Sequence, residues 1–427
     1  MNNGTETPPR NHRLLCQLGE KLCSGWKDMG KELYDRFIFV RNLLFDGLVI
    51  FFRHETSALQ GKRSVLIVRL DAIGDFVLWL DSAPELRKLY PSDRFNLVLL
   101  GNALWEELAV TVPFFDECIF VERNRFNYNL SYRYGIWKSL RSRCWATVIQ
   151  PTFSRECLYG DAVVRVCGAI EKIGSQGDLS NQFCWHRWIS NRWYTCLLPV
   201  CNRPLMELER NAEFIRALGG IDFLAGLPEI PLEFKSPAGF DAQNYAVVVP
   251  GASTALKQWP VERFAELGKL IHDMFGLSIV ICGSQSETAL GKRLLERIDA
   301  GKLDWIRDCT GKTSLLDLAM IIKGARLLVG NDSSAVHLAA AVGTPVLCIV
   351  SGIHFGRFIP YCVEQDTLKL MPMAIFHKMD CYGCNLQCRK AMRSDAPGEC
   401  LDLITVEEVW KKLSDWWIHD NSPKLDK

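Results

Sequence analysis

Residues 330–345 (GNDSSAVHLAAAVGTP) combine groups that could bind a phosphate. An apolar run ends at Gly330, polar residues typical of a tight turn and a helix N-cap follow, and an alanine-rich helical pattern then begins. Backbone N–H groups and the positive end of the dipole at a helix start favour an anion. His337, one turn into this helix, could reach the same anion or could be a hydrogen-bonded core histidine. The segment alone indicates a pocket for a nucleotide or sugar phosphate.

A second polar turn follows residues 64–70 (SVLIVRL), which have the composition of a short buried strand. The strand stops at Asp71-Ala-Ile-Gly-Asp75, and helical spacing continues over 76–90 until Pro91. Asp75 is therefore expected at the carboxyl edge of a parallel sheet, where ligands of open α/β sheets bind. The alternative is that Asp75 caps the helix expected to start at residue 76.

Residues 245–260 (YAVVVPGASTALKQWP) predict a further buried strand that ends at Pro-Gly. Ser253, Thr254 and Lys257 then offer hydroxyl groups and a cation at the mouth of a second sheet, although Lys257 could be an ordinary exposed lysine. Glu287 follows the next predicted strand and could accept hydrogen bonds from a ribose diol. It could equally be an exposed glutamate at a helix start, in which case Gln285 could make the contact with the nucleoside.

In this order and spacing, the motifs resemble those of glycosyltransferase family 9, the group that contains the bacterial lipopolysaccharide heptosyltransferases. The matching blocks are RLDAIGD, PGAS…K.WP.ERF, GNDSSAVHLAAAVGTP and a late cysteine cluster, and they extend from about residue 64 to about residue 409. The resemblance implies the GT-B fold and makes Asp75 the catalytic base. It also implies a donor site formed by Ser253, Thr254, Lys257, Glu287, Asp332, Ser333, Ser334 and His337.

The implied reaction is an inverting, metal-independent transfer of a sugar, with heptose from ADP-heptose as the expected donor and a lipopolysaccharide core or related envelope glycolipid as the acceptor. No cofactor is required, because Lys257 and hydroxyl groups could hold the diphosphate. Family members often carry Thr and Gly where this chain has Ser333 and Ser334, so the second side chain could narrow the pocket. A transferase for another nucleotide sugar, or an inactive nucleotide-sugar-binding membrane scaffold, remains an alternative.

The elements that must position these residues alternate along the chain. Apolar runs separated by helical patterns predict strands at 65–70, 95–100, 118–121, 146–150, 246–249, 278–282, 306–308, 327–329 and 346–350. We therefore expect an α/β protein with a helical extension at 1–60, an acceptor-binding Rossmann-like domain at 61–236 and a nucleotide-sugar-binding one at 237–427. A Pro/Gly-containing stretch at 235–239 is the predicted linker. No GxGxxG follows a predicted strand, which argues against a nicotinamide-dependent enzyme.

Composition is consistent with a cytoplasmic protein. The formal charge is +1, so net charge gives no argument for nucleic acid binding. The 17 cysteines are odd in number, and several lie in apolar strands, which favours reduced thiols over a disulfide framework. The first residues are polar and do not read as a signal peptide.

The apolar stretch 37–52 is too short and interrupted to span a membrane as a helix, which takes about 20 residues. As a helix it would carry one thin polar stripe containing Asp35, Asn42, Asp46 and Arg53. It either lies in a membrane interface, which would make the protein peripheral on the inner face of the cytoplasmic membrane, or docks against the first domain.

Residues 123–143 contain six basic residues and no acid, interleaved with Tyr and Trp. They could face an anionic glycolipid acceptor, and Arg123, Arg125 and Arg155 are the predicted acceptor contacts. The alternative is a solvated helix face.

The cysteines Cys381, Cys384, Cys388 and Cys400 have the spacing C-x2-C-x3-C-x11-C. Four nearby thiols could form a structural zinc site, although this spacing is irregular after the first pair. Local packing or redox-labile thiols are the alternatives.

Overall fold

The computed structural model describes residues 34, 36–51, 61–233, 241–298, 304–363, 371–390 and 396–421. The predicted linker at 235–239 lies outside these residues, as do 1–33 and 52–60 of the predicted extension. Asp35 and Arg53 of the predicted polar stripe are likewise outside them.

The first half of the chain forms a six-stranded parallel sheet in the order β3-β2-β1-β4-β5-β6. Its strands are β1 (Arg63–Arg69), β2 (Phe95–Asn102), β3 (Glu117–Val121), β4 (Trp145–Gln150), β5 (Glu171–Ser175) and β6 (Cys196–Leu198). The helices of this half are α2 (Ile73–Trp79), α3 (Ala83–Leu89), α4 (Glu106–Ala109), α5 (Arg123–Tyr128), α6 (Leu130–Arg141), α7 (Gly160–Val166), α8 (Cys184–Ser190) and α9 (Glu207–Leu218), with 3-10 turns η1 (Ala103–Trp105) and η2 (Asn191–Trp193).

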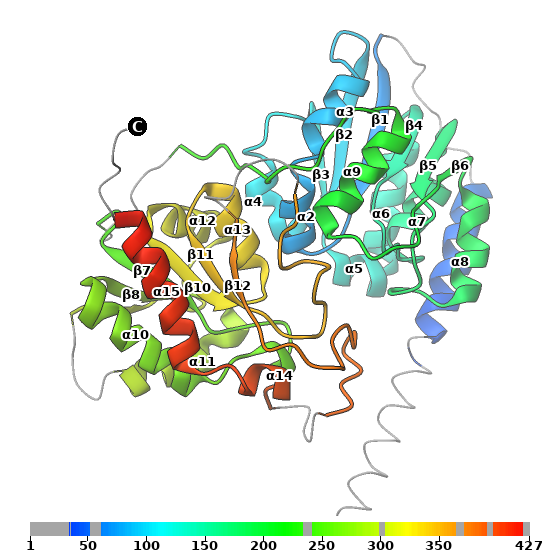
Figure 1. Ribbon diagram of the computed structural model, residues 1–427. Coiled ribbons are helices and arrows are strands. Elements are labelled where there is room, and N and C mark those ends of the chain that lie inside the picture. The colour runs from blue at the N-terminus through cyan, green and yellow to red at the C-terminus, as the bar shows by residue number, and fades with distance from the viewer. Residues whose placement is uncertain are drawn as a thin grey trace, which may run out of the picture.

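The second half repeats this architecture in the order β12-β11-β10-β7-β8-β9 (Figure 1). Its strands are β7 (Tyr245–Val249), β8 (Ser278–Ile281), β9 (Ile306–Asp308), β10 (Leu327–Asn331), β11 (Val346–Ile349) and β12 (Met373–Ile375). The helices are α10 (Val261–Phe275), α11 (Thr288–Ile298), α12 (Leu315–Gly324), α13 (Ser334–Val342), α14 (Glu399–Asp402) and α15 (Val406–Asn421), with 3-10 turns η3 (Ala255–Lys257) and η4 (Gln285–Glu287).

Both sheets are doubly wound, and strand order reverses between β1 and β4 in the first and between β7 and β10 in the second. Such a reversal opens a crevice beyond the carboxyl ends of the two strands. The motifs of the sequence analysis follow β1, β7 and β10, so they lie at these two crevices. The α/β prediction is confirmed, and all nine predicted strands are present.

Three strands and one break between helices were not predicted from the sequence. β5 carries charged residues, and β6 and β12 have three residues each, too few to show a pattern. The single helix predicted over 76–90 is wrong, because the chain breaks into α2 and α3. Pro84, near the start of α3, has no N–H to continue the hydrogen bonding of the preceding turn.

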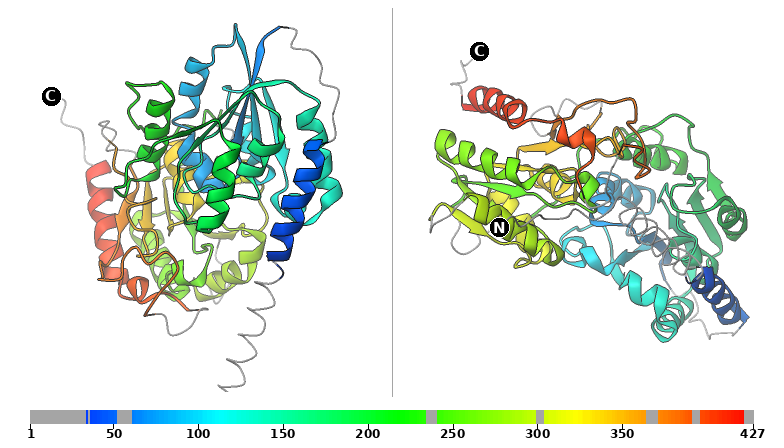
Figure 2. Two further views of the ribbon diagram at one scale, coloured as in Figure 1. Left: turned by 90° about the vertical axis from the view of Figure 1, so that its right-hand side faces the viewer. Right: turned by 90° about the horizontal axis from the view of Figure 1, so that it is seen from below.

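The two domains pack directly against each other through α2 and α13. A Cβ added at Gly74 would lie 3.2 Å from His337 Cδ2, so the helices approach at a point where only glycine fits without a shift. Ile230 N–H donates to Ala341 O (2.9 Å) just before the chain enters the second domain. Figures 1 and 2 show both sheets flanked by helices, with α15 lying over the second domain near α10.

The 36–51 helix docks against the first domain through its polar stripe. Asp46 is 2% exposed and accepts hydrogen bonds from Arg133 Nη2 (2.6 Å) and Trp137 Nε1 (2.8 Å). Asn42 is fully buried and donates to Asn127. Among the described residues, no helix has both the length and the apolar character needed to cross a membrane.

Candidate active site

A pocket of about 360 Å³ lies at the β1/β4 crevice and is closed on one side by Arg357 of the second domain. Charged and polar side chains dominate its wall. The lining residues are Asp71, Ala72, Asp75, Asn102, Leu104, Arg123, Thr152, Ser154, Glu156, Asn181, Glu207 and Arg357.

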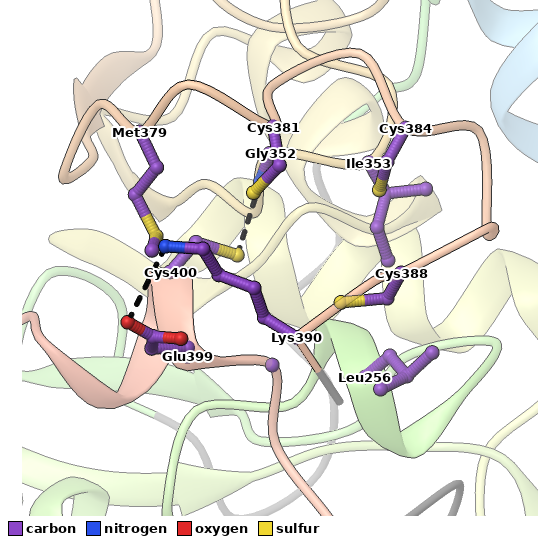
Figure 3. Close-up of a pocket in the computed structure, with 11 residues that line it drawn as sticks. Leu256, Gly352, Ile353, Met379, Cys381, Cys384, Cys388, Lys390, Glu399 and Cys400 are labelled. Atoms are coloured by element: carbon purple, nitrogen blue, oxygen red, sulfur yellow. Dashed lines mark hydrogen bonds and ion pairs between the residues drawn. The ribbon is translucent and has the colours of Figure 1, made fainter. Parts of the chain in front are cut away.

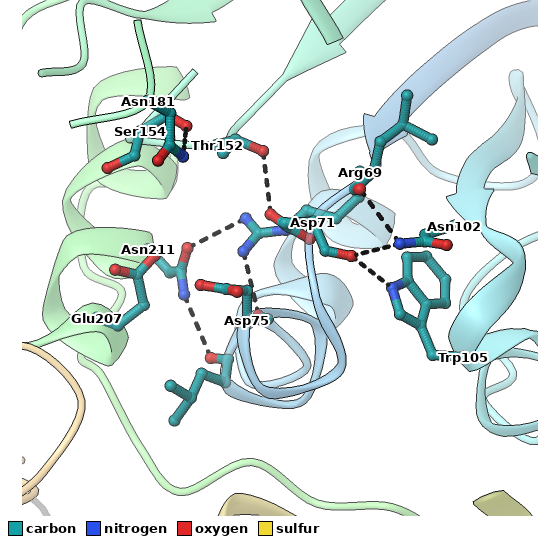
Figure 4. A network of polar contacts seen from close by, with 12 residues as sticks. Arg69, Asp71, Asp75, Asn102, Trp105, Thr152, Ser154, Asn181, Glu207 and Asn211 are labelled. Atoms are coloured by element: carbon teal, nitrogen blue, oxygen red, sulfur yellow. Dashed lines mark hydrogen bonds and ion pairs between the residues drawn. The ribbon is translucent and has the colours of Figure 1, made fainter. Parts of the chain in front are cut away.

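Asp75 lies in the first turn of α2, whose N-cap is Ala72. The alternative that Asp75 caps this helix is therefore wrong. Arg69, fully buried at the end of β1, holds the turn by donating from Nη2 to Asp75 O (3.1 Å) and pairing through Nε with Asp71 Oδ2 (2.9 Å). Figure 4 shows the Asp75 carboxylate beside this network and facing toward α9. Its oxygens are thus not used to satisfy the helix start.

The environment of Asp75 raises the pKa of its carboxyl from 3.8 to about 7. Burial is the largest cause, and the neighbouring carboxylates of Asp71 and Glu207 add to it, while Arg69 and Arg357 oppose the shift. A carboxylate with a pKa near neutrality can accept a proton from a hydroxyl and release it again to water.

Arg357 connects the second domain to the pocket. Its Nη2 donates to Ser154 Oγ (2.9 Å), its Nε contacts Glu207 Oε2 (3.4 Å), and its carbonyl oxygen accepts from Glu207 N (2.8 Å). Glu207 and Arg357 were not predicted from the sequence, because neither lies in a recognisable motif. Asp71 could have been found, since it shares the DAIGD turn with Asp75.

Of the three predicted acceptor arginines, Arg123 lines the pocket. It pairs with Glu156 (2.5 Å) and stacks over Tyr159, with Cζ 4.1 Å from the ring centroid. Arg125 is an exposed residue paired with Glu122 (2.6 Å). Arg155 is fully buried, with Nη1 3.4 Å from Asp161 Oδ1. The structure therefore brings only one of the three to the pocket wall, and acceptor binding remains a prediction for all three.

The β7/β10 crevice of the second domain is bridged by an ion pair. Lys257 Nζ lies 2.8 Å from Asp332 Oδ2, with side-chain exposures of 9% and 5%. Lys257 is thus buried, and the alternative of an ordinary exposed lysine is wrong. The pair brings together residues that follow β7 and β10, which are 75 positions apart in the sequence.

Ser333 is the N-cap of α13, but its side chain makes no capping bond. In the described part of the chain, its buried Oγ has no hydrogen-bond partner. Ser334 begins α13 and is partly buried, as is Thr254, whereas Ser253 is exposed. An unsatisfied hydroxyl beside the free N–H groups of a helix start can donate to an anion.

His337 lies inside the packing between α13 and α2. Its Nδ1 is 2.8 Å from Tyr361 Oη, and the two rings are stacked. Burial lowers the pKa of His337 to about 4, so the ring is neutral. These contacts match those of a hydrogen-bonded core histidine, and a donor contact for His337 remains a prediction.

Glu287 forms a capping box with Ser284 at the start of η4, accepting from Ser284 N (2.7 Å) and Ser284 Oγ (2.8 Å). A Cβ at Gly251 would lie 1.8 Å from Glu287 Oε1. Gly251 therefore lets this carboxylate reach the end of β7. A nucleoside contact for Glu287 remains a prediction.

The four late cysteines surround one small cavity of about 10 Å³, shown in Figure 3. Cys400 accepts from Gly352 N (3.4 Å), and burial together with the neighbouring Cys388 raises the pKa of Cys384. As they stand, no three His, Cys, Asp or Glu side chains of the described ranges have the arrangement to hold a metal ion.

Comparisons with known proteins agree with the sequence motifs. Residues 208–380 match the profile described as glycosyltransferase family 9 (heptosyltransferase). Lipopolysaccharide core heptosyltransferase OpsX of Haemophilus influenzae is 29% identical over 315 residues, covering 71% of this chain and 83% of that protein. The resemblance to glycosyltransferase family 9 is thereby confirmed.

A stronger but shorter match comes from lipopolysaccharide heptosyltransferase 2 of Escherichia coli K12, 32% identical over 101 residues. It covers 23% of this chain and 29% of that relative. The solved structure of E. coli ADP-heptose lipopolysaccharide heptosyltransferase II has a TM-score of 0.62 at 19% identity and covers 84% of this chain and 100% of that chain. This likeness confirms the predicted GT-B fold.

Proposed function

We propose that this protein is an inverting, metal-independent glycosyltransferase that moves heptose from ADP-heptose onto a lipopolysaccharide core or a related envelope glycolipid. The observation that carries the proposal is Asp75. It combines a pKa near 7 with a place in a polar pocket at the crevice of the first domain. The names of the similar proteins support the choice of heptose, of ADP and of this acceptor class.

The proposed reaction is a direct displacement. An acceptor hydroxyl in the pocket gives its proton to an Asp75 carboxylate oxygen as the hydroxyl oxygen forms a bond to the anomeric carbon. The bond between that carbon and the diphosphate oxygen breaks on the opposite side, and the electron pair leaves with ADP. A single carboxylate opposite the leaving group suits inversion, through a transition state with oxocarbenium character as in glycoside hydrolysis.

The leaving diphosphate is assigned to the β7/β10 crevice. There, Lys257 and the N-terminus of α13 supply positive charge, and the unpartnered Ser333 hydroxyl supplies a donor. Because Lys257 is already paired with Asp332, we expect the diphosphate to share the ammonium group with that carboxylate. These groups stabilise the charge that grows on the phosphate, which is the role a divalent cation has in other transferases. Transfer should therefore continue in excess EDTA.

The acceptor is assigned to the pocket between Arg123 and Arg357. Both arginines line it together with the acidic residues Asp71, Asp75, Glu156 and Glu207. The two guanidinium groups would bind an acidic sugar or phosphate of a glycolipid core, and the carboxylates would accept hydrogen bonds from its sugar hydroxyl groups. A lipid-linked acceptor also requires the enzyme to work at a membrane surface, and we propose the inner face of the cytoplasmic membrane.

The experiment that tests this assignment is a thermal-shift panel of nucleotide diphosphates and nucleotide sugars. ADP and ADP-heptose should raise the melting temperature in a concentration-dependent way, because a ligand that binds only the folded state stabilises it by mass action. A shift with another nucleotide sugar alone would favour the alternative donor. Binding of ADP-heptose without turnover on any core glycolipid would favour the inactive scaffold.

We also propose that the four late cysteines hold a structural metal ion, separate from the reaction. Four thiolates are a donor set that suits zinc, and all four line one cavity. The side chains would have to turn toward a common centre to bind the ion.

A further inference from the structure

The inward side of the 36–51 helix contains the polar residues Asn42 and Asp46 together with buried apolar residues, and a second apolar side of the helix is left uncovered. The buried apolar residues are Ile38, Phe39 and Val49. The outward side chains of the helix are between 51% exposed at Val40 and 86% exposed at Phe51. At about 100° per residue they fall within about 80° of one another around the helix. This outer stripe consists of Phe37, Val40, Leu44, Leu48 and Phe51.

Specific polar contacts fix which side of the helix faces the first domain. Asp46 pairs with buried Arg133, Arg41 donates to the carbonyl oxygen of Asn127, and Arg165 donates to that of Leu43 (2.9 Å). Turning the helix over to bury its apolar stripe would break these bonds and leave Arg133 without its carboxylate. The exposed stripe is therefore a fixed feature of the folded first domain.

The neighbouring helix α8 carries further exposed aromatic side chains. Phe39 packs against Trp185 and His186, with ring centroids 4.8 and 4.1 Å apart, which places α8 alongside the 36–51 helix. Figure 2 shows this helix at the outer edge of the first domain. Trp188 on α8 is 64% exposed and lies under the guanidinium of Arg192. We call the outer stripe and the exposed aromatic residues of α8 the apolar face.

Among the described residues, those around the apolar face include cations and almost no exposed acid. The only acidic residue at positions 36–51 is Asp46, which is 2% exposed, and neither 123–143 nor 179–206 contains any Asp or Glu. Arg36 and Arg192 are exposed, and Arg187 is partly exposed. Glu122, next to this region, is paired with Arg125. An apolar stripe with tryptophan and arginine at its edge has the chemistry of a surface that binds anionic lipid.

A short helix, α5, lies between the 36–51 helix and the pocket. Arg123 at one end of α5 lines the pocket, while Asn127 and Tyr128 at the other end accept hydrogen bonds from Arg41 of the 36–51 helix. A six-residue helix spans only about 9 Å. Asn181 lines the pocket as well, three positions before α8 begins.

We propose that the apolar face docks the enzyme on an anionic lipid bilayer. In that orientation the Arg123 side of the pocket lies close to the surface that carries a lipid-linked acceptor. This last point rests on the proposed function, whereas the docking itself does not.

The test is co-sedimentation of the full-length protein with phosphatidylethanolamine/phosphatidylglycerol vesicles and with phosphatidylcholine vesicles. Wild-type protein should bind the anionic vesicles, less so at high salt, and bind the neutral ones weakly. Leu44→Glu/Leu48→Glu should reduce binding to anionic vesicles at least tenfold. Both side chains point to solvent, at 64% and 60% exposure, so the melting temperature should stay near that of wild type.

The matched control is Ile221→Glu/Met274→Glu, which places the same charges at two other exposed apolar positions (76% and 65%). It should bind vesicles as wild type does. Equal binding by both double variants, or no binding by wild-type protein, would overturn the proposal. A wild-type dimer in light scattering that becomes a monomer in the helix variant would assign the face to a second copy instead. Transfer to a delipidated, soluble acceptor should be unchanged in the helix variant, and failure of that reaction in every form would count against the proposed function alone.

Discussion

Asp75 and Asp71 lie four positions apart in one turn and have different environments. Asp71 is paired with Arg69 and accepts a hydrogen bond from Thr152 (3.2 Å). The Asp75 carboxylate lies near two other carboxylates, and its pKa is raised to about 7. Two carboxyl groups in such different environments usually have different roles. We assign proton acceptance to Asp75 and a structural contact with Arg69 and Thr152 to Asp71.

The first prediction is that Asp75→Asn keeps the fold and the ADP-induced thermal shift but lowers kcat by roughly 10²–10⁴, the usual contribution of general base catalysis. The measurement is steady-state transfer by purified protein. Asp81→Asn is a matched control, because burial also raises the pKa of Asp81, to about 6, while the residue is not among those lining the pocket. Turnover of Asp75→Asn close to that of the control would remove Asp75 from the mechanism.

The second prediction concerns pH. Only the ionised carboxylate can accept a proton, so kcat/KM should rise with pH up to about 7 and then level off, following the pKa of free-enzyme Asp75. If kcat/KM instead rose around pH 4, the group that must be ionised for the reaction would be a carboxylate with an ordinary pKa.

The same raised pKa has a consequence for stability. The folded protein holds a proton on Asp75 that the unfolded chain releases between pH 3.8 and about 7, so this group lowers the free energy of unfolding as pH rises through that window. Asp75→Asn, which has no charge to bury, should therefore melt at a higher temperature than wild type at pH 8, and the difference should shrink toward pH 4.

At the scale of elements, the predictable part of the site consists of strands followed by polar turns. β1, β7 and β10 are continuous apolar runs, so their ends and the residues Asp75, Lys257 and Asp332 could be placed from sequence alone. The pairing of Lys257 with Asp332 could not, because it depends on β7 and β10 being neighbours. Glu207 and Arg357 also escaped prediction, since tertiary packing rather than local pattern brings them to the pocket.

For the 36–51 helix, the sequence predicted the element but not its orientation. Its amphipathic pattern was visible in the sequence, but the pattern did not say which side would face the protein. Buried Arg133 favours the observed orientation, because a fully buried guanidinium requires a partner such as Asp46. That partner is 87 positions away along the chain.

The third prediction concerns the cysteine cluster. Protein purified without oxygen should contain one zinc ion per chain by elemental analysis, and Cys384→Ser/Cys388→Ser should lose the ion and melt earlier while keeping its kcat at low temperature. Cys118→Ser, outside the cavity, is the control for loss of a thiol. Absence of any stoichiometric metal, or a large loss of kcat with an unchanged melting temperature, would contradict a structural metal site.

For the whole molecule, the two crevices are held in fixed relation by direct packing. Gly74 lies against His337, and Arg357 bonds to Ser154 and Glu207, so a chain segment of each domain helps to shape the other's surface. The proposed base and the proposed diphosphate site are thus positioned by opposite domains.

The most direct test of this account is the anomeric configuration of the product, determined by NMR after incubating the enzyme with ADP-heptose and a core glycolipid in excess EDTA. We predict transfer at an undiminished rate, with the configuration at the anomeric carbon inverted relative to the donor. Retention of configuration would contradict the single-base mechanism. Loss of transfer on chelation, with recovery on adding Mg²⁺ or Mn²⁺, would contradict the assignment of the diphosphate to Lys257 and the N-terminus of α13.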